Sequence, residues 1–239
     1  MSTALLFFNE KRILIKDKSS GVNLIEPFRI DSFNKFVEDR LKHLIQTNVI
    51  QKGIDIEEVL VDASECILVP NEIYNSSKKE AYLKLNYVNI DAEKVIVDEK
   101  LESINAYFIS TRLRWFINFC ENNLPQIPIA NTSRKYIDRI LKENKTDIHI
   151  VLKENTFDLI KLQSQKLYSF NTIEYNTVTD VIYFLIAHLN KLPIKAKSIV
   201  LYGSEKQGVE AALLFAKVEA LSTLRLNTFS ENEFINLLS

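Results

Sequence analysis

Two short turns carry the residues of this chain that could handle phosphate. They are Asn9-Glu10-Lys11 and Glu154-Asn155-Thr156, and each follows an apolar run. A turn that holds phosphate needs glycine, so that backbone N–H groups can approach the oxygens, and a carboxylate that positions metal and water. Neither turn contains glycine or aspartate. Both turns therefore lack what phosphate chemistry requires.

Two aspartates could serve metal-dependent chemistry. Asp158 and Asp180 would be the carboxylates of a two-metal nuclease site, in which carboxylates bridge the ions. Asp158, however, lies between Phe157 and Leu159 in an alternating stretch that is typical of a strand. Asp180 falls in the first turn of an expected helix, where an acid suits the helix dipole. Structural roles explain both residues better, so nuclease activity is only a third hypothesis.

The histidines and cysteines form no catalytic or metal-binding pattern. His43, His149 and His188 are far apart and have no cysteine beside them, so neither a zinc site nor a Ser-His-Asp arrangement is identifiable. Cys66 and Cys120 each lie in an apolar run, which is typical of small core residues. No metal site is therefore expected.

Composition and charge argue against several function classes. Of the 239 residues, 46% are hydrophobic and 26% are charged, as in a folded protein with a substantial core. The net charge of −1 gives no field that would attract nucleic acid or an anionic membrane. The N-terminal apolar run gains charge at Glu10, too early for a signal peptide, and no stretch reaches transmembrane length. We therefore expect a cytoplasmic protein without a nucleic-acid partner or membrane insertion.

The elements that must position these residues occur in the same order in both halves. The first half predicts strands at 4–8, 12–16 and 22–25, then a helix that begins at Asp31 or Ser32 and ends near Thr47. The second half predicts strands at 148–152, 157–162 and 167–173, then a helix that begins at Asn176 or Thr177. Shifting Asp31 by 145 positions gives Asn176, so the two helix starts align.

Further counterparts follow the first helix of each half. The predicted pairs are strands at 67–69 and 199–201, helices at 72–85 and 209–218, and strands at 106–109 and 224–226. A helix at 112–122 and a segment that starts at Pro125 come before a helix at 133–143. The predicted organisation is a first lobe at 1–124, a linker and connecting helix at 125–145, and a second lobe at 146–239.

This element order and three short segments resemble a known family. The segments are Leu68–Tyr74, Asn105–Ile109 and, above all, Phe170–Leu185, with the sequence FNTIEYNTVTDVIYFL. On these residues the chain is similar to a family of uncharacterised Bacteroidetes proteins with an actin-like ATPase fold, over nearly its whole length. The resemblance implies an α/β fold of duplicated ribonuclease-H-like lobes, with mixed sheets flanked by helices. It implies no activity, because the family's function is unassigned.

The wider actin-like superfamily implies where a nucleotide would bind. Its nucleotide-binding members carry Asp and Gly in the first turn of each lobe, and a glycine pair that holds adenosine. If ATP with Mg²⁺ binds here, the resemblance implies Gly203, Ser204 and Gly208 near the adenosine, and Asn155 or Lys11 near the phosphates. The ends of a strand and a helix explain the two glycines better.

The missing turn residues favour a non-catalytic binding or scaffolding protein, a pseudoenzyme that holds another protein and needs no cofactor. The alternative is a divergent ATP-binding protein or ATPase that uses the cleft between the lobes. The aromatic residues between 168 and 184 are better explained by core packing than by a recognition patch. Among them, Tyr175 at a strand–helix junction could turn its hydroxyl to solvent or a partner.

Overall fold

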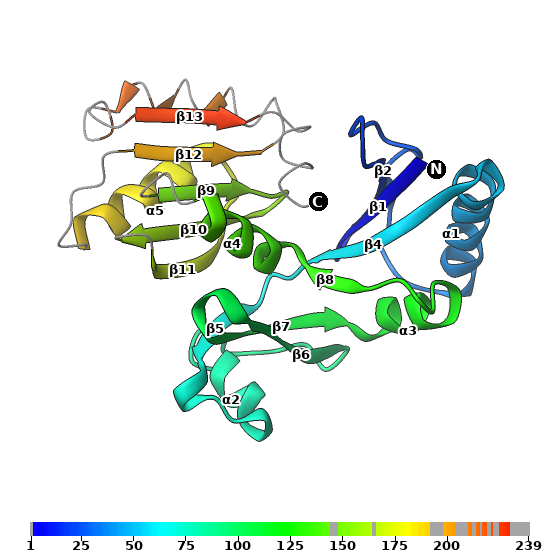
Figure 1. Ribbon diagram of the computed structural model, residues 1–239, viewed down its shortest axis with the longest axis horizontal. Coiled ribbons are helices and arrows are strands. Elements are labelled where there is room, and N and C mark those ends of the chain that lie inside the picture. The colour runs from blue at the N-terminus through cyan, green and yellow to red at the C-terminus, as the bar shows by residue number, and fades with distance from the viewer. Residues whose placement is uncertain are drawn as a thin grey trace. The chain divides into compact units, whose positions relative to one another are not determined.

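The chain folds into two compact units, Met1–Tyr136 and Ile137–Leu237, each with its own five-stranded sheet and core (Figure 1). The computed structural model describes residues 2–143, 148–163, 166–191, 198–203 and 225–229, together with 210–211, 214–215, 217–218 and 221. The predicted linker at 125–145 contains a strand of the first sheet and a helix that crosses from one unit to the next.

The first unit is built on a mixed sheet in the order β3-β2-β1-β4-β8. β1 and β2 pair antiparallel, as do β2 and β3, whereas β4 runs parallel to β1 and β8 runs parallel to β4. The strands are β1 (Ser2–Asn9), β2 (Arg12–Asp17), β3 (Phe28–Arg29), β4 (Ile54–Asp62) and β8 (Ile129–Asn131). The predicted third strand at 22–25 is wrong, because the turn held by the Asp17 carboxylate leaves only an isolated bridge between Lys16 and Asn23.

The second unit has a sheet of the same topology, in the order β11-β10-β9-β12-β13. β9, β10 and β11 pair antiparallel, and β12 and β13 run parallel to β9. The strands are β9 (Ile148–Leu152), β10 (Thr156–Gln163), β11 (Lys166–Glu174), β12 (Ser198–Tyr202) and β13 (Arg225–Phe229). A register shift opposite Lys161 and Leu162 makes Tyr168 the extra residue of a bulge in β11.

Helices cover one face of each sheet with apolar side chains. In the first unit α1 (Lys35–Asn48) and α3 (Arg114–Asn123) bury residues such as Leu41 and Phe116 against the strands. The cap of α1 is Asn34, whose Oδ1 accepts from Val37 N at 3.0 Å, and not Asp31 or Ser32 as predicted. In the second unit α5 (Val178–Lys191) covers the sheet. Of the helix expected at 209–218, the described residues 210–211, 214–215 and 217 are helical, and the others except 218 lie outside the described residues.

A small additional sheet in the first unit corrects two predicted correspondences. It has the order β5-β7-β6, with β5 (Cys66–Pro70), β7 (Ala106–Leu113) and β6 (Lys94–Leu101), and it carries the short helix α2 (Lys79–Leu83). The strand at 67–69 is therefore not the counterpart of β12, and that at 106–109 is not the counterpart of β13. Those places in the first sheet belong to β4 and β8, which pair as β12 and β13 do.

Four single turns of 3-10 helix complete the first unit. They are η1 (Ile50–Lys52), η2 (Asn71–Ile73), η3 (Ser76–Lys78) and η4 (Glu102–Ile104). The predicted helix at 72–85 is thus shorter than expected, with only α2 as regular α-helix. Gly53 closes η1 with φ of 69°, a left-handed conformation that suits glycine.

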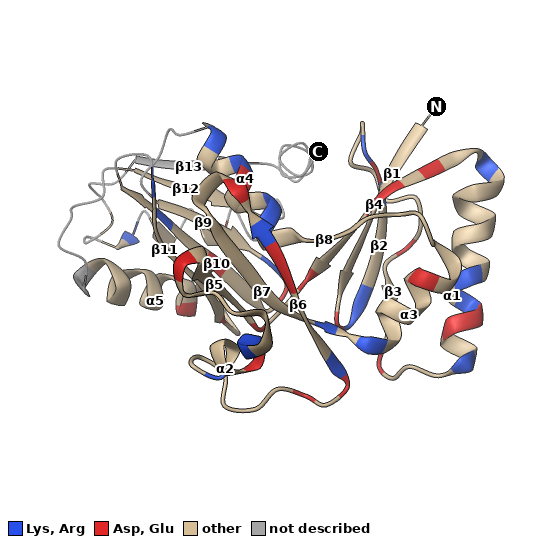
Figure 2. Cartoon of the chain, turned by 60° about the horizontal axis from the view of Figure 1, so that its bottom comes forward, with Lys and Arg blue, Asp and Glu red and all other residues tan. Residues whose placement is uncertain are grey.

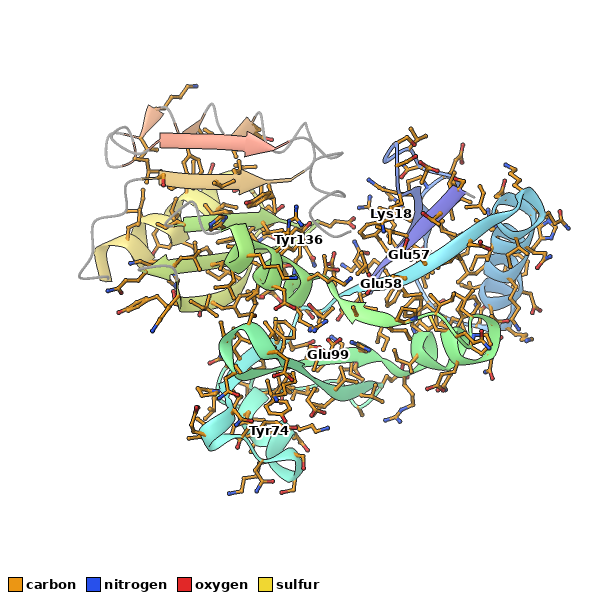
Figure 3. The ribbon with its side chains drawn as sticks, in the orientation of Figure 1. Lys18, Glu57, Glu58, Tyr74, Glu99 and Tyr136 are labelled. Carbon is orange, nitrogen blue, oxygen red and sulfur yellow. The ribbon has the colours of Figure 1, made fainter. Side chains whose placement is uncertain are left out.

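A bulge in β4 aims two neighbouring acids at different partners. Ala4 of β1 pairs with Ile56 and Leu5 pairs with Glu58, so Glu57 is the extra residue of the bulge. Lys18 Nζ lies 2.8 Å from Glu57 Oε1 and Lys135 Nζ 2.6 Å from Glu58 Oε2; Figure 3 labels Lys18 and both glutamates. Lys135 belongs to α4 (Thr132–Glu143), so the second pair fixes that helix to the sheet.

The cysteines and the charged residues agree with the expectations from composition. Cys66 and Cys120 are both free and buried, which confirms their predicted place in the core. Acidic and basic residues are interspersed along α1 (Figure 2), in keeping with the near-zero net charge. Among the helices of the described part of the chain, none has the length and apolar character needed to span a membrane.

Candidate functional site

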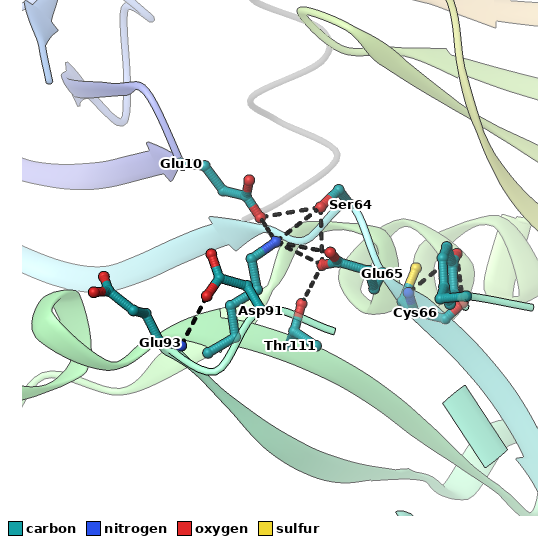
Figure 4. Close-up of polar contacts among 9 residues, drawn as sticks. Glu10, Ser64, Glu65, Cys66, Asp91, Glu93 and Thr111 are labelled. Carbon is teal, nitrogen blue, oxygen red and sulfur yellow. Dashed lines mark hydrogen bonds and ion pairs between the residues drawn. The ribbon is translucent and has the colours of Figure 1, made fainter. Parts of the chain in front are cut away.

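The turn between β1 and β2 is part of a polar cluster around Lys94. Lys94 Nζ lies 2.6 Å from Glu10 Oε1 and 2.8 Å from both carboxylate oxygens of Glu65 (Figure 4). Ser64 Oγ donates toward Glu10 at 3.0 Å or Glu65 at 2.9 Å, and Thr111 Oγ1 donates to Glu65 at 2.5 Å. Glu10, the central residue of the first turn, is thus bound to groups from the small sheet and the segment that leads to it.

Local structure explains why Lys94 reaches this turn. Lys94 is the first residue of β6, and the turn before it is held by Asp91, whose Oδ1 accepts from Glu93 N at 2.9 Å. Pairing with the last residue of β7, Leu113, fixes the start of the strand. The lysine therefore enters the cluster from a rigid strand end, and its side chain is only 7% exposed.

The cluster of Glu10, Glu65 and Lys94 carries a net negative charge, and its charged groups are bound to one another. Burial alone would raise the pKa of Glu65, but the hydrogen bonds from Lys94, Thr111 and Ser64 outweigh it and hold that pKa below its ordinary value. Burial alone would lower the pKa of Lys94, but its bonds to Glu10 and Glu65 raise it. Two carboxylates share one ammonium, so a phosphate would meet excess negative charge.

The predicted phosphate contact Lys11 does not join this cluster by any described bond. Its side chain is exposed, and its backbone carbonyl accepts from Ile30 N at 2.8 Å. The first turn is consequently tied to the segment after β3 by its backbone and to the small sheet by Glu10.

The turn between β9 and β10 is a tight hairpin with exposed side chains at Glu154 and Asn155. Lys153 N donates to Thr156 O at 2.9 Å, and Tyr175 N donates to Asn155 O at 3.0 Å. The Tyr175 hydroxyl donates to the Lys153 carbonyl at 2.5 Å, so it is buried and bound within the unit, not turned to solvent as proposed from the sequence.

A hollow of about 430 Å³ adjoins this second turn. It is lined by two acids and no base, its residues being Asn155, Glu174, Tyr175, Asn176, Asp180 and Phe184. A carboxylate-lined hollow repels phosphate, because like charges raise the cost of bringing in an anion. Asn155 therefore borders a cavity within the second unit, and the acidic lining of that cavity disfavours phosphate.

Both candidate metal ligands already have structural partners. Asp158 Oδ2 lies 2.9 Å from Lys153 Nζ and Asp158 Oδ1 accepts from Thr172 Oγ1 at 2.7 Å, in a pair whose side chains are 0% and 3% exposed. Asp180 Oδ2 accepts from Asn176 N at 3.0 Å and Thr177 N at 2.8 Å, which lowers its pKa and caps α5. No cluster of three metal-binding side chains occurs among the residues that the structure describes.

Gly203 follows β12 and packs closely against β9. A Cβ at this position would lie 3.1 Å from Leu152 Cβ, which is tighter than most Cβ contacts in proteins. Its observed contact is thus with the protein's own core, which fits the strand-end explanation. Ser204 and Gly208, the other residues of the adenosine hypothesis, lie outside the described residues.

Substituting Gly203 by alanine tests this packing. We expect Gly203→Ala to lower the free energy of unfolding by about 1–3 kcal/mol, because the new methyl group overpacks the contact with Leu152. Chemical denaturation followed by circular dichroism measures the change. The matched background is Leu152→Gly, which removes the Leu152 Cβ that the new methyl group would meet. Gly203→Ala should cost less in that background, and an equal cost in both backgrounds would contradict the clash.

The aromatic residues near the second turn divide between core and surface. Tyr175 is buried, and Phe184 packs against the second core. Tyr168 and Tyr183 are exposed, and the Tyr168 ring lies 5.1 Å from Lys161 Nζ. Core packing therefore explains only part of the group.

Comparisons with known proteins decide the family. The model of a family described as proteins of unknown function, DUF3822, matches residues 11–220. The chain belongs to the DUF3822 family. The curated proteins include no match to it.

Two solved structures show the fold of this DUF3822 protein. One is a Bacteroides thetaiotaomicron protein described as having an actin-like ATPase fold and unknown function; identity is 13%, the TM-score is 0.76, and 100% of this chain and 96% of that chain are covered. The other is described as a PilM-PilN type IV pilus biogenesis complex, with 11% identity, a TM-score of 0.54 and coverage of 98% and 90%. The α/β fold with an actin-like likeness, expected from the sequence, is confirmed.

The cluster partners of Glu10 in this DUF3822 protein were missed by sequence reasoning. Ser64, Glu65, Lys94 and Thr111 are between 54 and 101 positions away from Glu10 in the chain, as their numbers show. Ser64 and Glu65 lie in the connection between β4 and β5, Lys94 begins β6 and Thr111 lies within β7, and none of them belongs to a motif. No local signal could have joined them, because the small sheet alone brings them together.

Proposed function

We propose that this DUF3822 protein is a non-catalytic actin-like protein that binds another protein and does not bind ATP. The observation that carries the proposal is the ion pair between Glu10 and Lys94. A phosphate-binding turn needs free backbone N–H groups and net positive surroundings. The first turn instead presents a carboxylate that is already bound by an ammonium group.

The second turn supports the same proposal independently. Its neighbouring hollow is lined by Glu174 and Asp180, and Gly203 is in close contact with Leu152. Both features oppose nucleotide binding within the second unit, one by charge and the other by packing.

A protein partner is the further part of the proposal. The similar PilM-PilN structure is, by its description, a complex of two proteins that serves type IV pilus biogenesis. That relation shows that a chain of this fold can hold a protein, and it supports a binding role here. Exposed apolar side chains in the first unit, such as Ile50, Leu85 and Val88, are consistent with this role.

Titration with ATP and Mg²⁺ tests the loss of nucleotide binding. We expect no heat of binding by isothermal calorimetry and no rise in melting temperature with about 1 mM ATP. A ligand at about 100 times its dissociation constant would stabilise the protein by about 2.7 kcal/mol, so a site in the range of 10 µM would be visible. Mg²⁺ alone serves as the control.

Micromolar ATP binding would contradict the proposal and favour the divergent ATP-binding protein or ATPase. Asn155→Ala then locates the site, because Asn155 is the predicted phosphate contact that borders a cavity. Weakened binding in that variant would assign the nucleotide to the second turn.

A further inference from the structure

An apolar groove runs along one end of the first unit. Two adjoining hollows of about 430 and 380 Å³ form it, and they share the side chains of Ile50 and Asn123. The larger has an apolar floor of Ile54, Ile56, Leu124 and Ile127, and the smaller has Ile45 and Phe119. Both volumes fall in the range of sites that hold ligand groups.

Ile50 lines both hollows. It is the first residue of η1, directly after α1, and 48% of its surface is exposed. A polar side chain would be better solvated at such a turn, because exposing apolar surface costs about 25 cal/mol per Å². The exposed isoleucine completes the apolar lining of both hollows, and it gives a partner a surface to bury.

The two hollows have ionisable side chains of opposite kind in their linings. Lys42 and His43 border the smaller hollow, and Asp55 borders the larger one. Lys42 is paired with Glu38 at 2.8 Å, but an ammonium group has three donors and can also bind a second acceptor. Asp55 is exposed and has no ion pair among the described residues.

We propose that this groove is the docking site for an amphipathic helix of a partner protein, with apolar side chains on one face, an acid toward Lys42 and a base toward Asp55. Two adjoining apolar hollows can take two apolar side chains from one face of a helix, which is how amphipathic helices bind grooves. Opposite charges beside the two hollows favour one orientation of the helix. This inference rests on the proposed protein-binding function and gives that function a surface.

Labelled model helices test the groove directly. Four peptides of about 15 residues share an alanine-rich host and leucines at i, i+3 and i+7. They differ only in their ends, which carry Glu and Lys, Lys and Glu, two Glu, or two Lys. By fluorescence anisotropy, we expect one mixed-charge peptide to bind roughly tenfold more tightly than either like-charged peptide.

Substitutions in the groove make the test specific. Ile50→Glu should abolish binding of the preferred peptide, because it places a charge in the apolar lining that the two hollows share. Asp55→Lys should shift the preference to the peptide with two Glu ends. Val22→Glu is the matched control, since Val22 is also an exposed apolar residue of the first unit, 62% exposed, and borders neither hollow.

Absence of binding by all four peptides would overturn the groove proposal. So would binding that survives Ile50→Glu or ignores Asp55→Lys. These failures differ from failure of the proposed function, which is signalled by ATP binding in a separate titration. Circular dichroism of each variant shows that loss of binding does not come from loss of the fold.

Discussion

Replacing Asp158 by alanine is expected to lower the free energy of unfolding of the second unit by about 3–5 kcal/mol. The substitution leaves Lys153 with its side chain 3% exposed and without the carboxylate 2.9 Å from its ammonium nitrogen. Removing the carboxylate beside a buried ammonium group is costly, because the interior cannot replace that charge with water. The hydrogen bond from Thr172 is lost as well.

Two spectroscopic signals assign this effect to one unit. The chain has a single tryptophan, Trp115 in the first unit, whose ring stacks on Phe33 with centroids 4.1 Å apart. Asp158→Ala should therefore move the denaturation midpoint followed by circular dichroism further than the one followed by tryptophan fluorescence. A coincident shift of both signals would mean that the units unfold as one.

The double variant Lys153→Met, Asp158→Leu is the control. Because apolar residues of similar size often replace a buried ion pair at little cost, it should recover most of the lost stability. If the double variant is no more stable than Asp158→Ala alone, the loss of the carboxylate beside the Lys153 ammonium group is not the cause of the lost stability.

Replacing Lys94 by methionine is expected to destabilise the first unit by about 3 kcal/mol. The substitution removes the one ammonium group that Glu10 and Glu65 share, and it leaves their two carboxylates close together. The transition followed by Trp115 fluorescence measures the change. Lys100→Met is the matched control on the same strand, because the Lys100–Glu102 pair is exposed and should contribute less than about 1 kcal/mol.

The contribution of this cluster should also depend on pH. The pKa of Glu65 is held below its ordinary value of 4.5, so its stabilising effect is present above that value and is lost as pH falls through the folded pKa. The pKa of Lys94 is raised above 10.5, so its effect is present below that value and is lost at higher pH. The difference in stability between wild type and Glu65→Gln should therefore be largest near neutral pH. A difference that stays constant down to pH 3 would contradict this assignment.

Periodicity predicted the hairpins well but missed the strand that completes the first sheet. β4 carries apolar residues at Ile54 and Ile56, then at Val59 and Val61, so its alternation changes phase in the middle. The bulge at Glu57 causes this change, because one extra residue turns the following side chains to the other face. The bulge therefore makes the central strand β4 difficult to predict from periodicity. The sequence predicts the regular apolar run at 67–69 as the counterpart of 199–201 instead.

The candidate site was predictable only where it is local. The sequence predicts the first turn from its place between two strands and shows that this turn lacks glycine and aspartate. That Glu10 binds Lys94 could not be predicted, since the ion pair depends on where an inserted sheet packs. The same holds for Lys153, directly after β9, and Asp158 on β10, which meet only because the hairpin forms in this register.

The bulge at Tyr168 has a consequence for solubility. β11 is a nine-residue strand at the end of its sheet, and such an edge exposes backbone donors and acceptors to other copies of the chain. The extra residue breaks the regular spacing of those groups, so a neighbouring strand cannot pair along the whole edge. In the first unit, β3 and β8 have only two and three residues and offer little template at either edge. These three edges therefore disfavour pairing with a strand from another copy of the chain.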